Sequence, residues 1–447
     1  MDNLTLPRML DDNLLLRCST KGDAERLGEL YIEVFKLSDG SPEYSFIPWV
    51  RDLLDSGHPT FHEGDFTIIE DVSSGKFVSA MNLISQTWSY GGIRVPVGRP
   101  EAVATLPAYR NRGLVRAQFE VVHEWSRQRG ELLQGITGIP FYYRLFGYEM
   151  CVDLEGGRMG YPDSLPALTE RQQQAYQVRP ASESDVEFLS ALYQRGCERL
   201  LISCPRDKAL WHYELLGRSA PYDDNRVVWM ITSASGEALG FFLHPPALGP
   251  DYMNPTGISC YWYELKAGAS YLEITPVVLH HLLKTGRGYA EKAGKACTGV
   301  GLWLDSEHPA LQVSVQSLPN RKEAYAWYIL VNDLPAFLTH VAPVLEQRLA
   351  NSPCAGYSGD LNLSFYRSKL TFCFTGGRLQ EVTQVHFSGE EGCQAAFPGQ
   401  TFLHLVFGYR TLEEVEHMFP DCWAEDQVRP LLVALFPRLP SNIWPIS

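Results

Sequence analysis

Hydrophobic residues in the N-terminal third follow helical spacing in some segments and strand spacing in others. Apolar side chains recur every three or four positions over residues 23–37 and 43–54, which predicts two amphipathic helices. Alternation over residues 66–70 and 77–84, around a Ser-Ser-Gly turn, predicts a β-hairpin. The elements expected next are a strand at 99–105, a helix at 115–129, a strand at 133–138, a short helix at 142–146 and a last strand. This order indicates an α/β (α+β) fold with a mixed sheet.

The same pattern starts again after a linker. Residues 161–174 combine prolines with a run of glutamines, as is typical of a connection between domains. Beyond it, Val178-Arg-Pro-Ala-Ser-Glu-Ser-Asp185 parallels Leu16-Arg-Cys-Ser-Thr-Lys-Gly-Asp23, and a second hairpin is expected at 227–232 and 239–243. We therefore predict a second copy of the first fold.

A third kind of pattern begins near Tyr325. It predicts an amphipathic helix over 334–349, strands over 359–365, 369–375 and 377–385, and helices from Leu412 and over 429–436. At 447 residues the chain is too long for one ordinary domain. The sequence thus predicts three domains, at residues 1–166, 167–322 and 323–447.

Composition limits the possible functions. A hydrophobic content of 45% with 20% charged residues is typical of a globular protein. The net charge of −14 argues against nucleic acid as a partner and suits cationic amines. The ten cysteines form no Cys-x-x-Cys pair, so we expect free thiols and no metal site. Since the chain has neither a signal-peptide pattern nor an apolar run of membrane-spanning length, we expect a cytoplasmic protein without a membrane partner.

One segment carries the pattern of an anion site. The sequence Arg110-Asn111-Arg112-Gly113-Leu114-Val115 lies between the strand at 99–105 and the helix that follows. A loop that enters a helix presents unpaired N–H groups at the positive end of the helix dipole, which suits phosphate. The two arginines add charge and bidentate donors, and Gly113 allows close approach of the backbone. The segment therefore predicts a diphosphate-binding loop.

This loop resembles the pyrophosphate loop of the GCN5-related N-acetyltransferases (GNAT), written Arg/Gln-x-x-Gly-x-Gly/Ala. Val115 departs from the general motif, but the same replacement and the Phe146-Gly-Tyr148 segment are similar to the enhanced intracellular survival (Eis) branch. The resemblance implies two tandem GNAT-fold domains and a C-terminal sterol-carrier-like domain, whose Phe-Pro and Trp-Pro landmarks are present near the C-terminus. It also implies acetyl-CoA as co-substrate. The second copy lacks the loop, so we expect it to be catalytically silent.

The same resemblance suggests roles for individual residues. Main-chain groups of Val103, Ala104 and Thr105 would hold the thioester carbonyl, although Val103 and Thr105 also fit a plain core strand. Tyr143 would be the general acid that protonates the departing thiolate. Two bases remain open: the C-terminal carboxylate of Ser447, as in the Eis branch, and Glu101 on the strand before the loop.

The acceptor is expected to be a polycationic small molecule. Carboxylates and aromatic rings near the first two helices, among them Asp39, Glu43 and Trp49, could hold amines by charge pairing and cation–π contact. A solvated helix face explains the same residues equally well. We therefore expect an acetyl-CoA-dependent N-acetyltransferase acting on an aminoglycoside-like molecule or polyamine by direct attack. Two alternatives remain: protein lysine as the acceptor, or a non-enzymatic protein that binds acyl-CoA or lipid. A homo-oligomer also remains possible.

Overall fold

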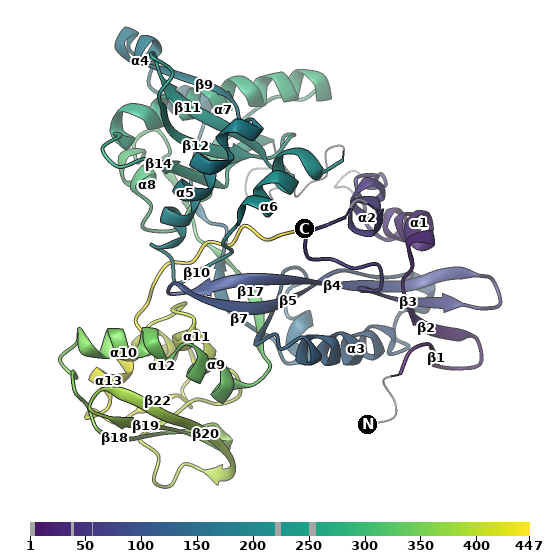
Figure 1. Cartoon of the computed structure of the whole chain (residues 1–447), viewed down its shortest axis with the longest axis vertical. Coiled ribbons are helices and arrows are strands. Elements are labelled where there is room, and N and C mark those ends of the chain that lie inside the picture. Colours follow the sequence, from purple (N-terminus) through teal and green to yellow (C-terminus); the bar gives the residue numbers. More distant parts are fainter. Residues whose placement is uncertain (1–4, 37–39, 56, 220–224, 250–255) are drawn as a thin grey trace.

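The computed structural model describes residues 5–36, 40–55, 57–219, 225–249 and 256–447. Its largest sheet has nine strands in the order β1-β2-β3-β4-β5-β6-β17-β7, with β10 paired to β4. The strands of this sheet are β1 (Arg8–Met9), β2 (Leu14–Cys18), β3 (Phe66–Asp71), β4 (Lys76–Tyr90), β5 (Ile93–Thr105), β6 (Leu133–Ile136), β7 (Glu149–Leu154), β10 (Ile202–Ser203) and β17 (Tyr325–Val331). Helices α1 (Ala24–Val34) and α2 (Phe46–Asp55) lie on one face of the sheet, and α3 (Leu114–Gln128) lies on the other (Figure 1). The predicted mixed α/β class is confirmed.

The β4–β5 hairpin is longer than predicted. Both strands extend by several residues beyond the segments expected at 77–84 and 99–105. Three consecutive polar residues open the added part of β4 and interrupt the apolar alternation, and buried residues of this part bind segments far away in the sequence. Tyr90, for example, is fully buried and donates its hydroxyl to the Val406 carbonyl (2.6 Å), far away in the sequence. Strand periodicity alone therefore could not show its true extent.

The middle of the chain forms two smaller sheets, ordered β14-β12-β11-β9 and β13-β15-β8-β16. Their strands are β8 (Gly157–Gly160), β9 (Tyr176–Pro180), β11 (Val227–Ser233), β12 (Ala238–His244), β13 (Gly257–Cys260), β14 (Trp262–Leu265), β15 (Gly299–Leu302) and β16 (Asn320–Lys322). The helices here are α4 (Glu170–Ala175), α5 (Val186–Cys197), α6 (Lys208–His212), α7 (Tyr271–Ala293) and α8 (Pro309–Val313).

The repeated sequence at the start of the first two regions forms the same corner twice. Arg17 binds both carboxylate oxygens of Asp23 (2.9 and 2.8 Å), which also caps the turn before α1. Arg179 binds both oxygens of Asp185 (2.7 and 2.6 Å) in the same way before α5. In each case a short side chain, Thr20 or Ser182, completes a capping box. The similarity read from the sequence is thus a similarity of local structure.

The first two regions exchange a strand. β17 inserts between β6 and β7 of the large sheet, while β8 inserts between β15 and β16 of a smaller one. Each exchanged strand follows the last strand of its own region after a turn of two residues. The boundaries predicted at 166/167 and 322/323 remain predictions. β8 lies before the first boundary and pairs with strands that follow it, and β17 lies after the second boundary and pairs with strands of the first region.

The last region contains one sheet, ordered β20-β19-β18-β21-β22, with helices against it (Figure 1). Its elements are α9 (Leu334–His340), α10 (Ala342–Ala350), β18 (Gly359–Ser364), β19 (Tyr366–Thr375), β20 (Arg378–Gly389), β21 (Ala395–Ala396), α11 (Leu403–Val406), α12 (Leu412–Met418), β22 (Trp423–Ala424) and α13 (Arg429–Leu435). The single helix expected over 334–349 is in fact two. It breaks at Val341, where the following Pro343 cannot donate a backbone hydrogen bond.

The C-terminal tail leaves this region and returns to the first. In Figure 1 the yellow trace runs past β10 and ends above β4 and β5, near α2 and α6. The last residue, Ser447, is 2% exposed. Among the described residues, no helix is long and apolar enough to cross a membrane.

Candidate active site

The centre of the site is a fork between two parallel strands. β5 and β6 pair only at Val97↔Leu133 and Gly98↔Gln134, and beyond these pairs the strands separate. A cavity of about 210 Å³ lies at this fork. Its lining comes from β5, from the chain after β6 and from the first helices: Phe35, Phe46, Arg99, Pro100, Glu101, Ala102, Val103, Ile136, Thr137, Gly138, Ile139 and Tyr143. Because the strands separate, main-chain N–H and C=O groups of β5 that would otherwise pair with a neighbouring strand face the cavity.

A β-bulge bends β5 beside the cavity. Asn82 pairs with Glu101 and Ala80 pairs with Ala104, so Met81 opposes two residues, Ala102 and Val103. Ala102 has a φ of 51°, which is strained for a residue with a Cβ. Farther along, the Leu106 amide donates to the Val78 carbonyl of β4 (2.9 Å). By strand alternation, the Thr105 amide then points to the opposite side, toward the fork.

The predicted phosphate loop follows β5 directly. After a 3₁₀ turn at Pro107–Tyr109, Asn111 and Gly113 both adopt positive φ (61° and 76°), and Gly113 is the N-cap of α3. A Cβ at Gly113 would meet nothing within 4 Å, so backbone conformation rather than space favours glycine. Leu114 is buried in the core, and Val115 packs against the cluster around Phe119. These two apolar residues fix the first turn of α3, whose N–H groups lack helical partners.

The loop arginines are accessible. Arg110 is exposed and makes one long hydrogen bond from Nε to the Thr105 carbonyl (3.4 Å). Arg112 pairs with Asp11 (2.7 Å), and both side chains of this pair are over 40% exposed. Such an exposed pair is screened by water and stabilises the protein little. A diphosphate could therefore replace Asp11 at little cost.

Tyr143 lies across the fork from Glu101 on a 3₁₀ turn, Tyr142–Phe146. It is 5% exposed and contacts the rings of Phe119, Tyr148 and Tyr328. Burial raises the pKa of its hydroxyl, and the nearby Tyr142, Tyr328 and Glu101 raise it further. The group therefore stays protonated at neutral pH, as a general acid must.

The two candidate bases meet at one buried arginine. Arg99 donates from Nη2 to Glu101 Oε1 and from Nη1 to the carbonyl of Ile446 (3.1 Å), the residue before the C-terminus. Arg99 thus links Glu101 to the residue next to Ser447. Sequence reasoning placed both residues among the candidates but missed the arginine between them.

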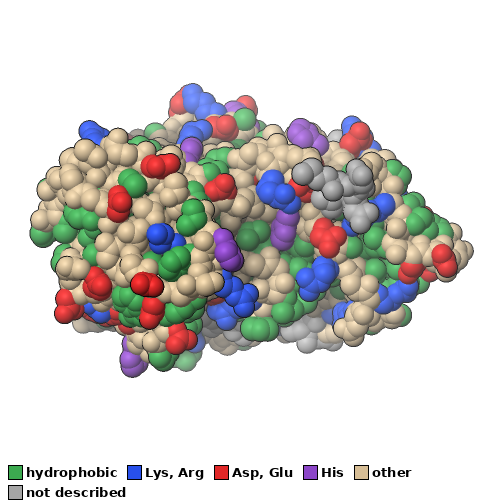
Figure 2. All heavy atoms as spheres, turned by 90° about the horizontal axis from the view of Figure 1, so that it is seen from below, with side chains coloured by type: hydrophobic (Ala, Val, Ile, Leu, Met, Phe, Trp, Pro, Cys, Tyr) green, Lys and Arg blue, Asp and Glu red, His purple; other side chains and the backbone are tan. Residues whose placement is uncertain are grey.

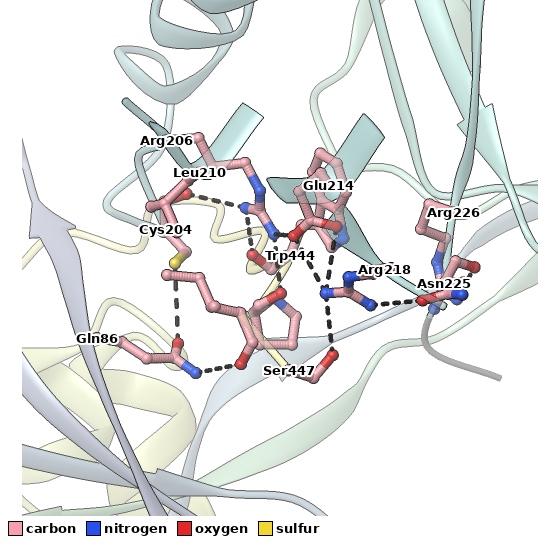
Figure 3. A network of polar contacts seen from close by, with 12 residues as sticks. Gln86, Cys204, Arg206, Leu210, Glu214, Arg218, Asn225, Arg226, Trp444 and Ser447 are labelled. Carbon is pink, nitrogen blue, oxygen red and sulfur yellow. Dashed lines mark hydrogen bonds and ion pairs between the residues drawn. The ribbon is translucent and has the colours of Figure 1, made fainter. Parts of the chain in front are cut away.

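A polar network holds the tail in place (Figure 3). The fully buried guanidinium of Arg206 donates to the carbonyls of Trp444 (2.6 Å) and Pro445 (2.8 Å), and it lies 3.5 Å from the centre of the Trp444 ring. Its charge is balanced by Glu214 (3.2 Å). Gln86 Nε2 donates to the Ile446 carbonyl (2.6 Å). The last three peptide groups of the chain are therefore each fixed by a side chain.

The end of the tail has its own contact. Arg218 donates from Nη2 to the Ser447 hydroxyl (3.4 Å) and also binds Glu214 (3.2 Å), as Figure 3 shows. Polar residues inside apolar strands, such as Gln86 and Arg99, are the only sequence signal that could have revealed this network. Nothing in the sequence indicated that their partner would be the C-terminus.

Of the predicted substrate residues, the structure describes Glu43 and Trp49. Asp39 lies outside the described residues. Glu43 accepts a hydrogen bond from its neighbour Ser45 (2.9 Å). Trp49 is 3% exposed and packs against Tyr31, Phe46 and Phe66. Its ring therefore serves the hydrophobic core in this structure, and no face of it is open to an amine.

Comparison with known families identifies the region that contains this site. Residues 16–151 match the family model of an acetyltransferase (GNAT) domain. The chain contains a GNAT domain. It is therefore an enzyme of the N-acetyltransferase type. No curated protein matches the sequence.

Solved structures share the fold of this chain along most of its length. A GCN5-related N-acetyltransferase from Kribbella flavida is 17% identical, with a TM-score of 0.62 over 97% of this chain and 100% of the other. Eis1 from Mycobacterium abscessus is 14% identical, with a TM-score of 0.56 over 94% and 96%. The N-myristoyltransferase of Saccharomyces cerevisiae with bound myristoyl-CoA is 11% identical, with a TM-score of 0.50 over 74% and 82%. At these identities the likeness is one of fold.

Proposed function

We propose that the enzyme transfers the acetyl group of acetyl-CoA to a primary amine of a small molecule by direct attack. The observation that carries this proposal is the fork itself, where β5 and β6 part beside Tyr143 and directly before the Arg110–Gly113 loop. The loop would bind the diphosphate of the coenzyme, and the fork would receive its thioester arm. The myristoyl-CoA held by the yeast N-myristoyltransferase of similar fold supports a coenzyme A thioester as co-substrate.

The mechanism assigns one step to each part of the site. Main chain of Val103–Thr105 would hold the thioester carbonyl, with the Thr105 amide directed to the fork. A base takes a proton from the ammonium group of the acceptor, and the amine nitrogen attacks the carbonyl carbon. When the tetrahedral intermediate collapses, the C–S bond breaks and Tyr143 protonates the coenzyme thiolate. The former amine nitrogen then loses its second proton to the Tyr143 phenolate, which restores the acid. The products are an amide and free coenzyme A.

We favour the Ser447 carboxylate as the base over Glu101. One carboxylate oxygen of Glu101 is already occupied by a hydrogen bond from Arg99. The tail, in contrast, is fixed by Arg206, Gln86 and Arg99 through its carbonyls, which leaves its terminal carboxylate to act. In this proposal Glu101 serves to hold Arg99 against the tail.

The acceptor class is proposed as a polycationic amine. The net charge of −14 favours the approach of cations, and Glu43 lies near the helices that line the fork. Acidic and basic side chains are interspersed on the face seen in Figure 2, so we place no acidic docking patch there. A second cavity, of about 160 Å³, shares Arg99 and Thr137 with the first and is also lined by Trp303 and Trp327. We propose it as further room for the acceptor.

The remaining regions are assigned by the same proposal. The middle region would be a second GNAT-like unit without activity, because its long helix α7 starts after Ser270 with no arginine and glycine loop before it. The last region would be sterol-carrier-like. The ten cysteines are all unpaired, which fits a reducing cytoplasm.

A thiol-release assay tests the proposal. The full chain with acetyl-CoA and a panel of aminoglycosides, polyamines and lysine peptides should release free coenzyme A with at least one polycationic member. Calorimetry should detect acetyl-CoA binding that Arg110→Ala with Arg112→Ala weakens by about tenfold or more. Release with lysine peptides alone would move the acceptor to proteins. Undiminished affinity in the double variant would remove the loop from the mechanism.

A further inference from the structure

A further polar cavity, separate from the two cavities beside the fork, lies where the three regions of the chain meet. Its volume is about 360 Å³, within the range of small-molecule sites. It is lined by the β7–β8 turn, the connection from β15 to α8, the β16–β17 turn and two segments of the last region. The last of these segments holds Arg438 and Ser441, at the start of the C-terminal tail. None of the residues assigned to acetyl transfer lines this cavity.

Three cations of this cavity have no carboxylate partner within the described part of the chain: Arg158, Lys322 and Arg410. Arg158 donates instead to the carbonyls of Leu318 (3.0 Å) and Pro319 (3.4 Å). Arg410 donates to the carbonyl of Tyr409 (3.2 Å). Guanidinium and ammonium groups so placed keep donors available for an anion.

The other charges of the cavity are largely committed. Arg321 pairs with Glu323 (3.0 Å), and Arg438 pairs with Glu414 (2.9 Å) outside the lining. Asp305 lies 3.6 Å from Arg199 and accepts a hydrogen bond from the Glu307 amide (3.2 Å). The unbalanced charge of the cavity is therefore positive.

Two carboxyl groups of the lining, Asp153 and Glu155, oppose this charge. Asp153 makes no ion pair with either neighbouring arginine, Arg410 or Arg438. Burial raises the pKa of Asp153 to about 6, so it carries its negative charge at neutral pH only at a penalty. An anion in the cavity would be opposed by these two carboxyl groups and attracted by the three cations.

We propose that this cavity binds a small polyanion that carries phosphate groups, separately from the coenzyme loop. Arg158 and Lys322 lie in the exchanged β8–β16 pair, while Arg410 comes from the last region. A bound polyanion would join these elements at the start of the tail. The site does not depend on the proposed acetyl transfer.

Calorimetry with inorganic pyrophosphate tests this site in the full chain. The Arg110→Ala, Arg112→Ala background removes the coenzyme loop as a competing phosphate site. In that background pyrophosphate should still bind, and Lys322→Met with Arg410→Met should weaken binding by about tenfold or more. Asp153→Asn should strengthen binding at pH 7, because it removes one opposing charge. Arg171→Met with Lys295→Met removes an exposed arginine and an exposed lysine outside the cavity; it is the charge-matched control and should bind as the background does.

Two results would overturn the proposal. One is loss of all pyrophosphate binding in the loop-deficient background, which would assign the anion to the coenzyme loop alone. The other is equal weakening by the Arg171→Met, Lys295→Met control and by the cavity variant, which would indicate a general effect of net charge. Circular dichroism of each variant excludes unfolding as the cause.

Discussion

Single residues in this site owe their properties to what surrounds them. Tyr142 and Tyr143 are neighbours with the same side chain, yet only Tyr143 lies inside the fork. It is in contact with three other aromatic rings, and its hydroxyl lies close to Gly138, where an added Cβ would come within 3.5 Å of it. Burial then favours the neutral phenol, which holds the proton needed by a leaving thiolate.

Tyr143→Phe should lower kcat by about 10²–10⁴-fold with little change in the KM for acetyl-CoA, because it removes a proton and preserves the ring. Initial rates of thiol release measure both constants. Since the pKa of Tyr143 is raised, the wild-type rate should not fall on the alkaline side through this group until well above neutral pH. Tyr142→Phe is the matched control and should keep full activity. Equal rates for Tyr143→Phe and wild type would exclude the acid role.

At the scale of elements, one helix has a glycine with positive φ at each end. Gly113 precedes α3 with a φ of 76°, and Gly130 follows it with a φ of 69°. An added Cβ would meet nothing within 4 Å at either position. Alanine at either site therefore carries only the backbone strain of a left-handed conformation, about 1–2 kcal/mol. Alanine substitutions at the two positions therefore distinguish an effect on helix stability from an effect on coenzyme binding.

Gly113→Ala and Gly130→Ala should lower the melting temperature by similar amounts. Only Gly113→Ala should also raise the dissociation constant of acetyl-CoA, because relaxation of the strain reorients the N–H groups at the start of α3. Thermal unfolding and calorimetry measure the two effects. Equal coenzyme affinity in the two variants would show that the loop does not bind the diphosphate.

At the scale of the whole molecule, the C-terminus joins the regions. Its last peptide groups bind Gln86 and Arg99 from the large sheet and Arg206 from the middle region. The tail itself comes from the last region, so this single segment links all three regions. Ser447 itself is buried, with 2% of its surface exposed.

Two glycines added after Ser447 should therefore reduce kcat by tenfold or more, about the scale of one misplaced catalytic group. The extension moves the terminal carboxylate away from the fork and also lowers the melting temperature. Ser447→Ala keeps the carboxylate and loses only the long hydrogen bond from Arg218, so it should remain close to wild type. Full activity in the extended chain would leave Glu101 as the base, and Glu101→Gln would then abolish turnover.

The sequence by itself determined the local features of this protein. Capping residues fixed the repeated corners at Asp23 and Asp185, and the order of apolar periods fixed the mixed fold of the first region. The phosphate loop was recognisable because its arginines and Gly113 act over a few consecutive positions. Its role in coenzyme binding remains a prediction.

The tertiary structure alone decided what depends on distant contacts. It showed that Trp49 belongs to the core, that β8 and β17 change places, and that Arg99 lies between Glu101 and the tail. Exchanged strands carry the same alternation whichever sheet they join, so their partners leave no trace in the pattern. A buried arginine such as Arg206 likewise reveals its need for a partner, while only the folded chain supplies the carbonyls of its own last residues.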